Sequence, residues 1–110
     1  HDAFMQAQAV DGYMVTFHVM KAQPGQAMGG DHDFMVRIER DGQVQTDLVV
    51  NSKVVYPDKS AASKMMMKMG DWYMAGYDMA QRGQYQLMVL FRTPDGSKHF
   101  GGVYYPGPAR

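Results

Sequence analysis

Three segments of this chain carry a large β-forming apolar residue at every second position over most of their length, and turn signals separate them. Residues 13–21, 32–40 and 85–91 place Val, Ile, Leu, Phe or Tyr at every second position. Side chains alternate across a strand, so this pattern predicts half-buried β-strands. Asp-Gly pairs at 11–12 and 41–42 predict tight turns. Because no segment shows a sustained period of 3.6, the sequence predicts an all-β fold, an antiparallel immunoglobulin- or cupredoxin-like sandwich of seven or eight strands.

The remaining segments are less regular. Residues 43–50 predict a third strand after the 41–42 turn, and residues 98–105 predict a last strand that Gly101-Gly102 weakens. The first ten residues fit either an irregular lead-in or an edge strand. Residues 60–63 are compatible with a short helical turn.

The charge and length of the chain exclude several classes of protein. Eleven basic residues balance eleven acidic ones, which gives no electrostatic footprint for nucleic acid or an anionic membrane. No apolar run approaches the roughly 18 residues of a membrane span. We expect a single domain over residues 1–110. Because the chain starts at His1 without a methionine, we also expect a mature form that has lost a signal peptide.

Cysteine is absent and methionine is abundant. The absence of cysteine excludes disulfides, zinc–thiolate sites and thiol catalysis. Twelve methionines in 110 residues are far more than an ordinary domain contains. A β core draws more naturally on Val and Ile, and methionine specifies a core poorly. The excess therefore indicates a role beyond packing.

Half of the methionines and the only tryptophan lie within residues 64–79. Strand alternation places three of these methionines on one face, namely Met65, Met67 and Met69, and places Met66 on the other. Gly70-Asp71 predicts a turn, and a second strand then carries Trp72 and Met74. This stretch predicts a methionine-rich β-hairpin.

Two interpretations suit such a hairpin. Thioether sulfur is a neutral, soft ligand for Cu(I), and it survives oxidising conditions in which cysteine would form disulfides. The alternative is that Met65, Met67 and Met69 pack in the core and Met66 is merely exposed.

Three histidines add candidate nitrogen ligands. His18 lies between Met14 and Met20 on the polar face of its strand, and the alternative for it is a solvated imidazole. His32 stands between two aspartates, where capping of a turn is the alternative. His1 could chelate copper through its amino group and ring, as in copper carriers with an N-terminal histidine, or it could be a remnant of processing. The serines lack the context of a catalytic nucleophile.

The order of features resembles the YtkA-like and FixH-like group of small exported bacterial β-sandwich domains. The resemblance rests on DHDFMVRIERDGQVQTDLVV and MGDWYMAGYDMAQRGQYQLMVLF and covers residues 13–91. It implies an exported protein that handles copper or another heavy metal. The methionine segment of that group corresponds to Met65, Met66, Met67 and Met69, although the usual alternation of Pro and Met is missing here.

The leading hypothesis is an exported copper-binding carrier or accessory of metal homeostasis, not an enzyme. Its ligands are predicted in order of preference: Met65, Met67 and Met69 first, then Met66 and Met74, with His18, His32 or His1 supplying nitrogen. A metal-efflux or respiratory-complex protein is the expected partner. The alternative is a structural module without metal, which presents a methionine and aromatic surface to a protein partner.

Overall fold

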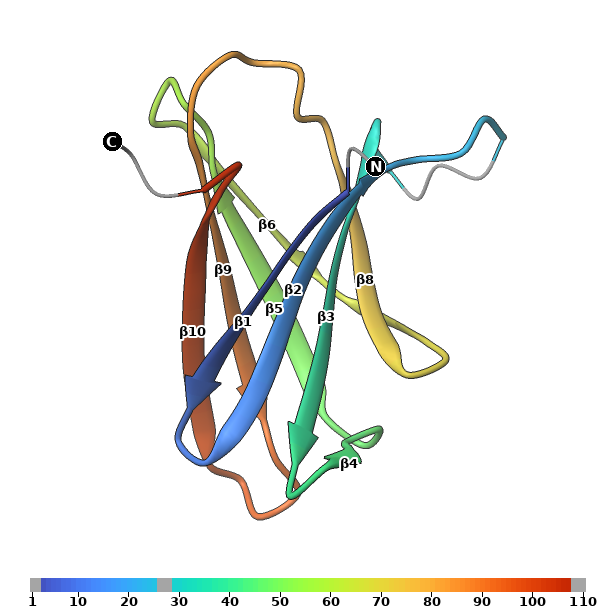
Figure 1. Cartoon of the computed structure of the whole chain (residues 1–110), viewed down its shortest axis with the longest axis vertical. Helices are drawn as coiled ribbons and strands as arrows, with labels where there is room; N and C mark the ends of the chain where they lie inside the picture. The colour runs from blue at the N-terminus through green and yellow to red at the C-terminus, as the bar shows by residue number, and fades with distance from the viewer. Residues whose placement is uncertain (1–2, 26–28, 108–110) are drawn as a thin grey trace.

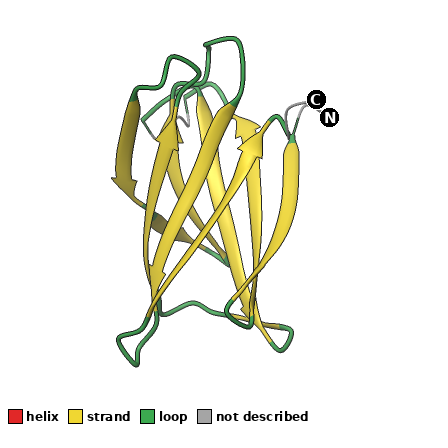
Figure 2. Ribbon diagram, turned by 90° about the vertical axis from the view of Figure 1, so that its left-hand side faces the viewer, coloured by secondary structure: helices red, strands yellow, loops and turns green. Residues whose placement is uncertain are grey.

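The computed structural model describes residues 3–25 and 29–107, and they form two packed antiparallel sheets (Figures 1 and 2). We call them sheet A and sheet B. Sheet A has the order β1 (Phe4–Val10), β2 (Tyr13–Lys21), β3 (His32–Arg40), β8 (Trp72–Tyr77) and β7 (Met67–Met69), with β4 (Gln43–Val44) paired to β3. Sheet B has the order β10 (Lys98–Tyr105), β9 (Tyr85–Arg92), β5 (Val49–Val55) and β6 (Ala61–Met65). The all-β prediction is confirmed.

The core lies between the inner faces of the two sheets. The apolar positions of the three alternating segments supply most of its large side chains, and β5 and β8 add others. Its largest fully buried side chains include Phe17, Phe34, Tyr77, Tyr85 and Phe91. Burying side chains of this size contributes about 1.5–3 kcal/mol each. Within the described residues no helix is present that could cross a membrane.

The described residues contain ten strands, because predicted segments are divided between the sheets. The predicted strand over residues 43–50 splits into the short β4 in sheet A and the start of β5 in sheet B. Tyr73 holds the connection, since its hydroxyl donates to Gln45 O at 3.1 Å and accepts from Leu48 N–H at 3.2 Å. Residues 60–63 enter strand β6 rather than a helical turn, and the first residues described form edge strand β1.

The methionine segment also divides, at Met66. Strand β6 pairs with β5 in sheet B, whereas β7 pairs with β8 in sheet A. Met66 between them is buried in the core, and its N–H donates to Val50 O at 2.9 Å. The chain therefore crosses from one sheet to the other. The β7–β8 hairpin exists as predicted, but Met65 does not share a face with Met67 and Met69.

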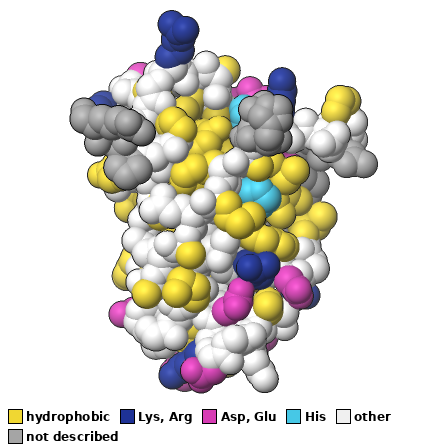
Figure 3. Space-filling model, in the orientation of Figure 1, with side chains coloured by type: hydrophobic (Ala, Val, Ile, Leu, Met, Phe, Trp, Pro, Cys, Tyr) yellow, Lys and Arg dark blue, Asp and Glu magenta, His cyan; other side chains and the backbone are white. Residues whose placement is uncertain are grey.

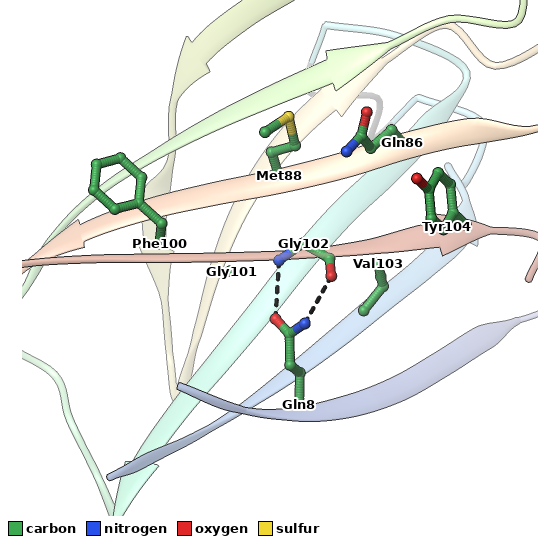
Figure 4. A pocket seen from close by; sticks show the side chains of 8 residues that line it. All are labelled: Gln8, Gln86, Met88, Phe100, Gly101, Gly102, Val103 and Tyr104. Atoms are coloured by element: carbon green, nitrogen blue, oxygen red, sulfur yellow. Dashed lines mark hydrogen bonds between the residues drawn. The ribbon is translucent and has the colours of Figure 1, made fainter. Parts of the chain in front are cut away.

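On the side of the sandwich away from Met66, a side chain links the edge strands of the two sheets. The Gln8 amide donates to Gly102 O and accepts from Gly102 N–H, each at 2.9 Å (Figure 4). It thereby links β1, at the edge of sheet A, to β10, at the edge of sheet B. A Cβ on Gly101 would lie 2.8 Å from Gln8 Oε1, so a larger residue there would push the Gln8 side chain away from this arrangement. The two sheets are therefore linked on one side by the chain at Met66 and on the other by the Gln8 amide.

Candidate metal centre

A histidine and four methionines form a row across the outer face of sheet A. The strand register aligns Met5 with His18, His18 with Met35, Met35 with Met74, and Met74 with Met67. Directly paired residues of antiparallel strands point to the same face, and their Cβ atoms lie about 5 Å apart. This row brings thioethers from four strands to both sides of one imidazole.

A second row adds a carboxylate beside the first. Met20 pairs with Asp33, one same-face step along β2 and β3 from His18 and Met35. His18, Met20, Asp33 and Met35 therefore form a four-residue patch on two adjacent strands, and each side chain is half-buried. The patch offers nitrogen, sulfur and oxygen donors within one small area.

The described residues leave three buried side-chain polar atoms without a hydrogen-bond partner, and all three belong to this patch. They are both ring nitrogens of His18 and Oδ1 of Asp33. Buried polar atoms in folded proteins are nearly always partnered, so an unpartnered one calls for an explanation such as a bound ion. The convergence of all three atoms on one methionine-rich face indicates a ligand site.

The environment keeps His18 in the form that binds metals. Burial lowers the pKa of His18 below its ordinary value, so the imidazole is neutral at neutral pH. A neutral imidazole has a free lone pair and is the ligand form. Burial also raises the pKa of Asp33, while the charge of His32 opposes that rise.

Trp72 borders the patch on the side of β8. Its ring lies 5.5 Å from the His18 ring, tilted by 57°. The Arg37 guanidinium stacks 4.9 Å from the Trp72 ring centroid and also contacts Glu39 at 2.9 Å. Figure 3 shows a histidine surrounded by hydrophobic side chains on the face toward the viewer, with basic and acidic groups just below. These contacts fix the tryptophan beside the imidazole.

The structure places three of the predicted sulfur ligands on this face. Met74 is almost fully buried in the same row as His18. Met67 pairs with Met74, and Met69 pairs with Trp72 at the edge of the sheet, and both are exposed. The other two lie elsewhere: Met65 points outward from sheet B opposite Asn51, and Met66 is in the core.

The other predicted nitrogen ligands do not join the patch. His32 pairs with Tyr77 and lies on the side of β3 opposite to Asp33. Its Nδ1 is 2.7 Å from Asp31, whose carboxylate also accepts Met79 N–H at 2.8 Å, so these contacts tie the start of β3 to the end of β8. His1 lies outside the described residues. In the described part of the chain no three His, Cys, Asp or Glu side chains are grouped for a metal, so any site here depends on thioethers.

Sequence reasoning missed Met5, Asp33 and Met35 as members of this face. Met35 was recognisable as an outward residue of its strand, and Met20 as a neighbour of His18. Only the pairing of β2 with β3 and of β3 with β8 brings them together. A single sequence does not reveal that register.

The outer face of sheet B is methionine-bearing too, but its chemistry differs. Exposed or half-exposed apolar side chains cover it, namely Val49, Met65, Met88, Leu90, Phe100 and Tyr104. Its strands contain no carboxylate, whereas Lys53, Arg92 and Lys98 are exposed there. Figure 4 shows Phe100, Met88, Gln86 and Tyr104 around Gly102, on the side away from Gln8, where they line a shallow groove.

Comparison with known proteins gives one informative match. No protein-family model matches this chain, and no curated protein sequence matches it. The resemblance to YtkA-like and FixH-like domains thus stays an expectation. A solved structure, a copper-bound glutamate-to-glutamine variant of FetP from uropathogenic Escherichia coli, matches with a TM-score of 0.74 and 13% identity. The match covers 98% of this chain and 100% of that one, and it establishes a shared fold.

Proposed function

We propose that this protein binds Cu(I) on the outer face of sheet A and acts as an exported carrier or accessory of copper homeostasis rather than as an enzyme. The observation that supports this most strongly is the state of His18. Its ring is neutral, both ring nitrogens are buried and have no hydrogen-bond partner among the described residues, and it stands in register between Met5 and Met35.

The donor set suits a soft monovalent ion. Thioether and imidazole are the ligands that Cu(I) favours, whereas Mg²⁺ and Ca²⁺ require several oxygens. His18 would supply nitrogen, and Met35 would supply sulfur from the neighbouring strand. Met5 lies directly opposite His18 on the other neighbouring strand, and Met20 and Met74 stand one position further out; these three would complete the set. The Trp72 ring beside His18 would favour a cation there through its π face.

The same row of residues supports a carrier role. Met74 is almost fully buried, whereas its partner Met67 and the adjacent Met69 are exposed at the sheet edge. Exchange from buried to exposed thioethers would carry the ion toward an acceptor. The copper-bound FetP variant with a similar fold agrees with this function.

Export and an acceptor protein belong to the same proposal. The chain has methionine but no cysteine, which suits an oxidising compartment such as the periplasm. A metal-efflux or respiratory-complex protein would be the acceptor.

The test is an anaerobic Cu(I) titration against a chromophoric chelator, with two matched double variants. Met35→Leu with Met74→Leu removes sulfurs from the sheet A row, and Met65→Leu with Met88→Leu removes two from sheet B. Leu replaces Met at similar volume, so both variants should fold. We expect the first variant to lose about 100-fold in Cu(I) affinity, the upper end of the effect that outer-shell substitutions have on metal sites. We expect the second variant to match the wild type.

The only tryptophan provides an independent readout. Because Trp72 lies beside His18, copper bound in the patch should quench its fluorescence at the stoichiometry found by chelator competition. A folded wild-type protein that binds no Cu(I) would overturn the proposal. Loss of Cu(I) binding in the sheet B variant but not in the sheet A variant would overturn it as well.

The exposed face of sheet B favours a second candidate function, a protein-interaction module. Arg92 and Lys98 are directly opposite each other, and like charges in that position repel. An acidic partner with an apolar side chain for the groove over Gly102 would relieve this repulsion and cover Phe100. A second copy of the chain in a face-to-face pair fits poorly, because it would oppose cation to cation.

A labelled glutamate-rich peptide with one central leucine is the probe for that surface. We expect its fluorescence anisotropy to rise with wild-type protein and to stay flat with Arg92→Glu plus Lys98→Glu. Equal binding by both proteins, or none by either, would contradict an acidic partner on sheet B. Sedimentation velocity of the chain alone would reveal self-association instead.

A further inference from the structure

Several aspartates in the structure accept hydrogen bonds from backbone N–H groups, and Asp33 differs from them. Asp31 accepts Met79 N–H, Asp58 accepts Ser60 N–H, and Asp95 accepts Ser97 N–H, so each has a structural task. Oδ1 of Asp33, by contrast, is buried and has no partner within the described residues. Burying a carboxylate oxygen without a hydrogen bond or a cation is costly. The carboxylate of Asp33 is therefore suited to bind a cation or a group that donates a hydrogen bond.

The surroundings of Asp33 show where such a ligand would sit. Asp33 pairs with Met20 and with Gly76, and it precedes Met35 by two residues on the same face of β3. His18 is its diagonal neighbour, at a Cβ separation of about 7 Å or somewhat less in an antiparallel pair. His32 is next in sequence but lies on the other side of the strand. The unpartnered oxygen thus accompanies the unpartnered nitrogens of His18.

We propose that Asp33 gives this site an oxygen ligand, so that the same patch binds Cu(II) through His18 and Asp33 as well as Cu(I) through His18 and the thioethers. This inference rests on the proposed copper function and deepens it. Cu(II) prefers nitrogen and oxygen donors in tetragonal geometry, whereas Cu(I) prefers sulfur. His18 lies between the two kinds of donor, with Met35 directly opposite it and Asp33 on the diagonal.

Such a mixed set has a physical consequence for selectivity. A divalent cation offsets the buried negative charge of Asp33, which a monovalent ion does less strongly. Met20 and Met35 occupy the other two corners of the patch and remain available for the softer ion. Removing the Asp33 charge should therefore weaken Cu(II) far more than Cu(I).

The experiment compares wild type, Asp33→Asn and the control Asp71→Asn, all as full chains. Asparagine keeps the shape of aspartate and removes its charge. Asp71 lies in the exposed turn between β7 and β8, so its variant controls for loss of one carboxylate. Cu(II) affinity is measured by competition with glycine, and electron paramagnetic resonance reports the ligands. Cu(I) affinity is measured anaerobically on the same preparations.

We expect Asp33→Asn to lose at least about tenfold in Cu(II) affinity, the effect that even an outer-shell substitution has on a metal site. Its resonance parameters should shift away from mixed nitrogen and oxygen ligation, and its Cu(I) affinity should stay close to wild type. Asp71→Asn should behave as wild type throughout. Near-ultraviolet circular dichroism confirms that each variant is folded.

Other outcomes separate this inference from the proposed function. Unchanged Cu(II) binding by Asp33→Asn, or equal losses for both ions, would overturn the role of Asp33 while leaving Cu(I) binding in place. A wild type that binds Cu(I) but not Cu(II) would do the same. A wild type that binds neither ion would overturn both proposals. A wild type that binds Cu(II) alone would overturn the Cu(I) function and the shared site, and would leave only the role of Asp33 as a Cu(II) ligand.

Discussion

The outer faces of the two sheets both present methionines, yet only one of them resembles a metal site. On sheet A, Met35 and Met5 flank His18, and the part of the chain that the structure describes offers no hydrogen-bond partner to the nitrogens of this histidine. On sheet B, Met65 and Met88 lie among aromatic and cationic side chains with no carboxylate in the strands. A methionine is therefore a candidate ligand when strand pairing places it beside an imidazole without a hydrogen-bond partner. The spacing of methionines along the chain does not identify such ligands.

Two half-buried histidines repeat this contrast. His99, in sheet B, has Nδ1 2.8 Å from Asp11 and Nε2 3.0 Å from Ser97, and its ring lies 5.0 Å from Phe91. Within residues 3–25 and 29–107, His18 has no hydrogen bond to either ring nitrogen. His99 therefore stabilises the fold, whereas His18 is buried at a cost that ligand binding would offset.

The largest expected effect concerns copper affinity. Removing the ring nitrogens through His18→Phe should reduce Cu(I) affinity about 100-fold, because the patch loses its imidazole donor. His99→Phe should leave the affinity unchanged. Chelator competition measures both, and equal losses would show that neither histidine defines the site.

The next effect is on stability, and it has opposite signs for the two histidines. His99→Phe should lower the free energy of unfolding by about 2 kcal/mol, because it removes the hydrogen bonds of the ring to Asp11 and Ser97. His18→Phe should leave the metal-free protein equally stable or about 1 kcal/mol more stable, because it removes two unpartnered polar atoms. Urea denaturation measures both values. Destabilisation by His18→Phe of the same size as by His99→Phe would mean that His18 is an ordinary structural residue.

A smaller effect is expected in the pH dependence of the metal-free protein. The pKa of His18 is lower in the folded state than its ordinary value of about 6.5. The unfolded chain therefore binds more protons in the window just below pH 6.5, and the stability contribution of neutral His18 is full above that pH and lost as pH falls. Wild type should lose more stability than His18→Phe between pH 7 and 5. Parallel curves for the two proteins would contradict burial of His18.

The smallest effect is expected on sheet B. Phe100→Ser replaces an exposed ring, so the free energy of unfolding should change by no more than about 0.5 kcal/mol and copper affinity should not change. Binding of the glutamate-rich peptide should weaken. A loss of copper affinity in this variant, measured by the same titration, would blur the distinction between the two faces.

The sequence predicted which side chains of a strand face the core better than it predicted which strands are paired. Alternation over residues 13–21 and 32–40 correctly separated Phe17 and Phe34 from His18 and Met35, because alternation is a local property of a strand. It could not show that Met66 carries the chain from one sheet to the other, since that depends on its backbone bond to Val50. Met65, Met67 and Met69 thus looked like one set.

The candidate site was predictable only in part for the same reason. His18, Met67, Met69 and Met74 were named from their residue types, and they do lie on one face. Met5 and Met35 joined them only through pairings across strands β1, β2 and β3. The two-residue turn at 11–12 fixes the pairing of Met5 with His18 once residues 4–10 are known to form a strand. The loop between β2 and β3 does not fix the pairing of His18 with Met35, so the complete row required the structure.

The most direct test is the position of copper itself. Crystals grown with Cu(I) under anaerobic conditions and measured at the copper absorption edge would give an anomalous difference peak. We predict one strong peak on the outer face of sheet A, within bonding distance of a ring nitrogen of His18 and of at least one sulfur among Met5, Met20, Met35 and Met74. A peak at Met65 or Met88 on sheet B, or none in well-diffracting crystals, would contradict the account.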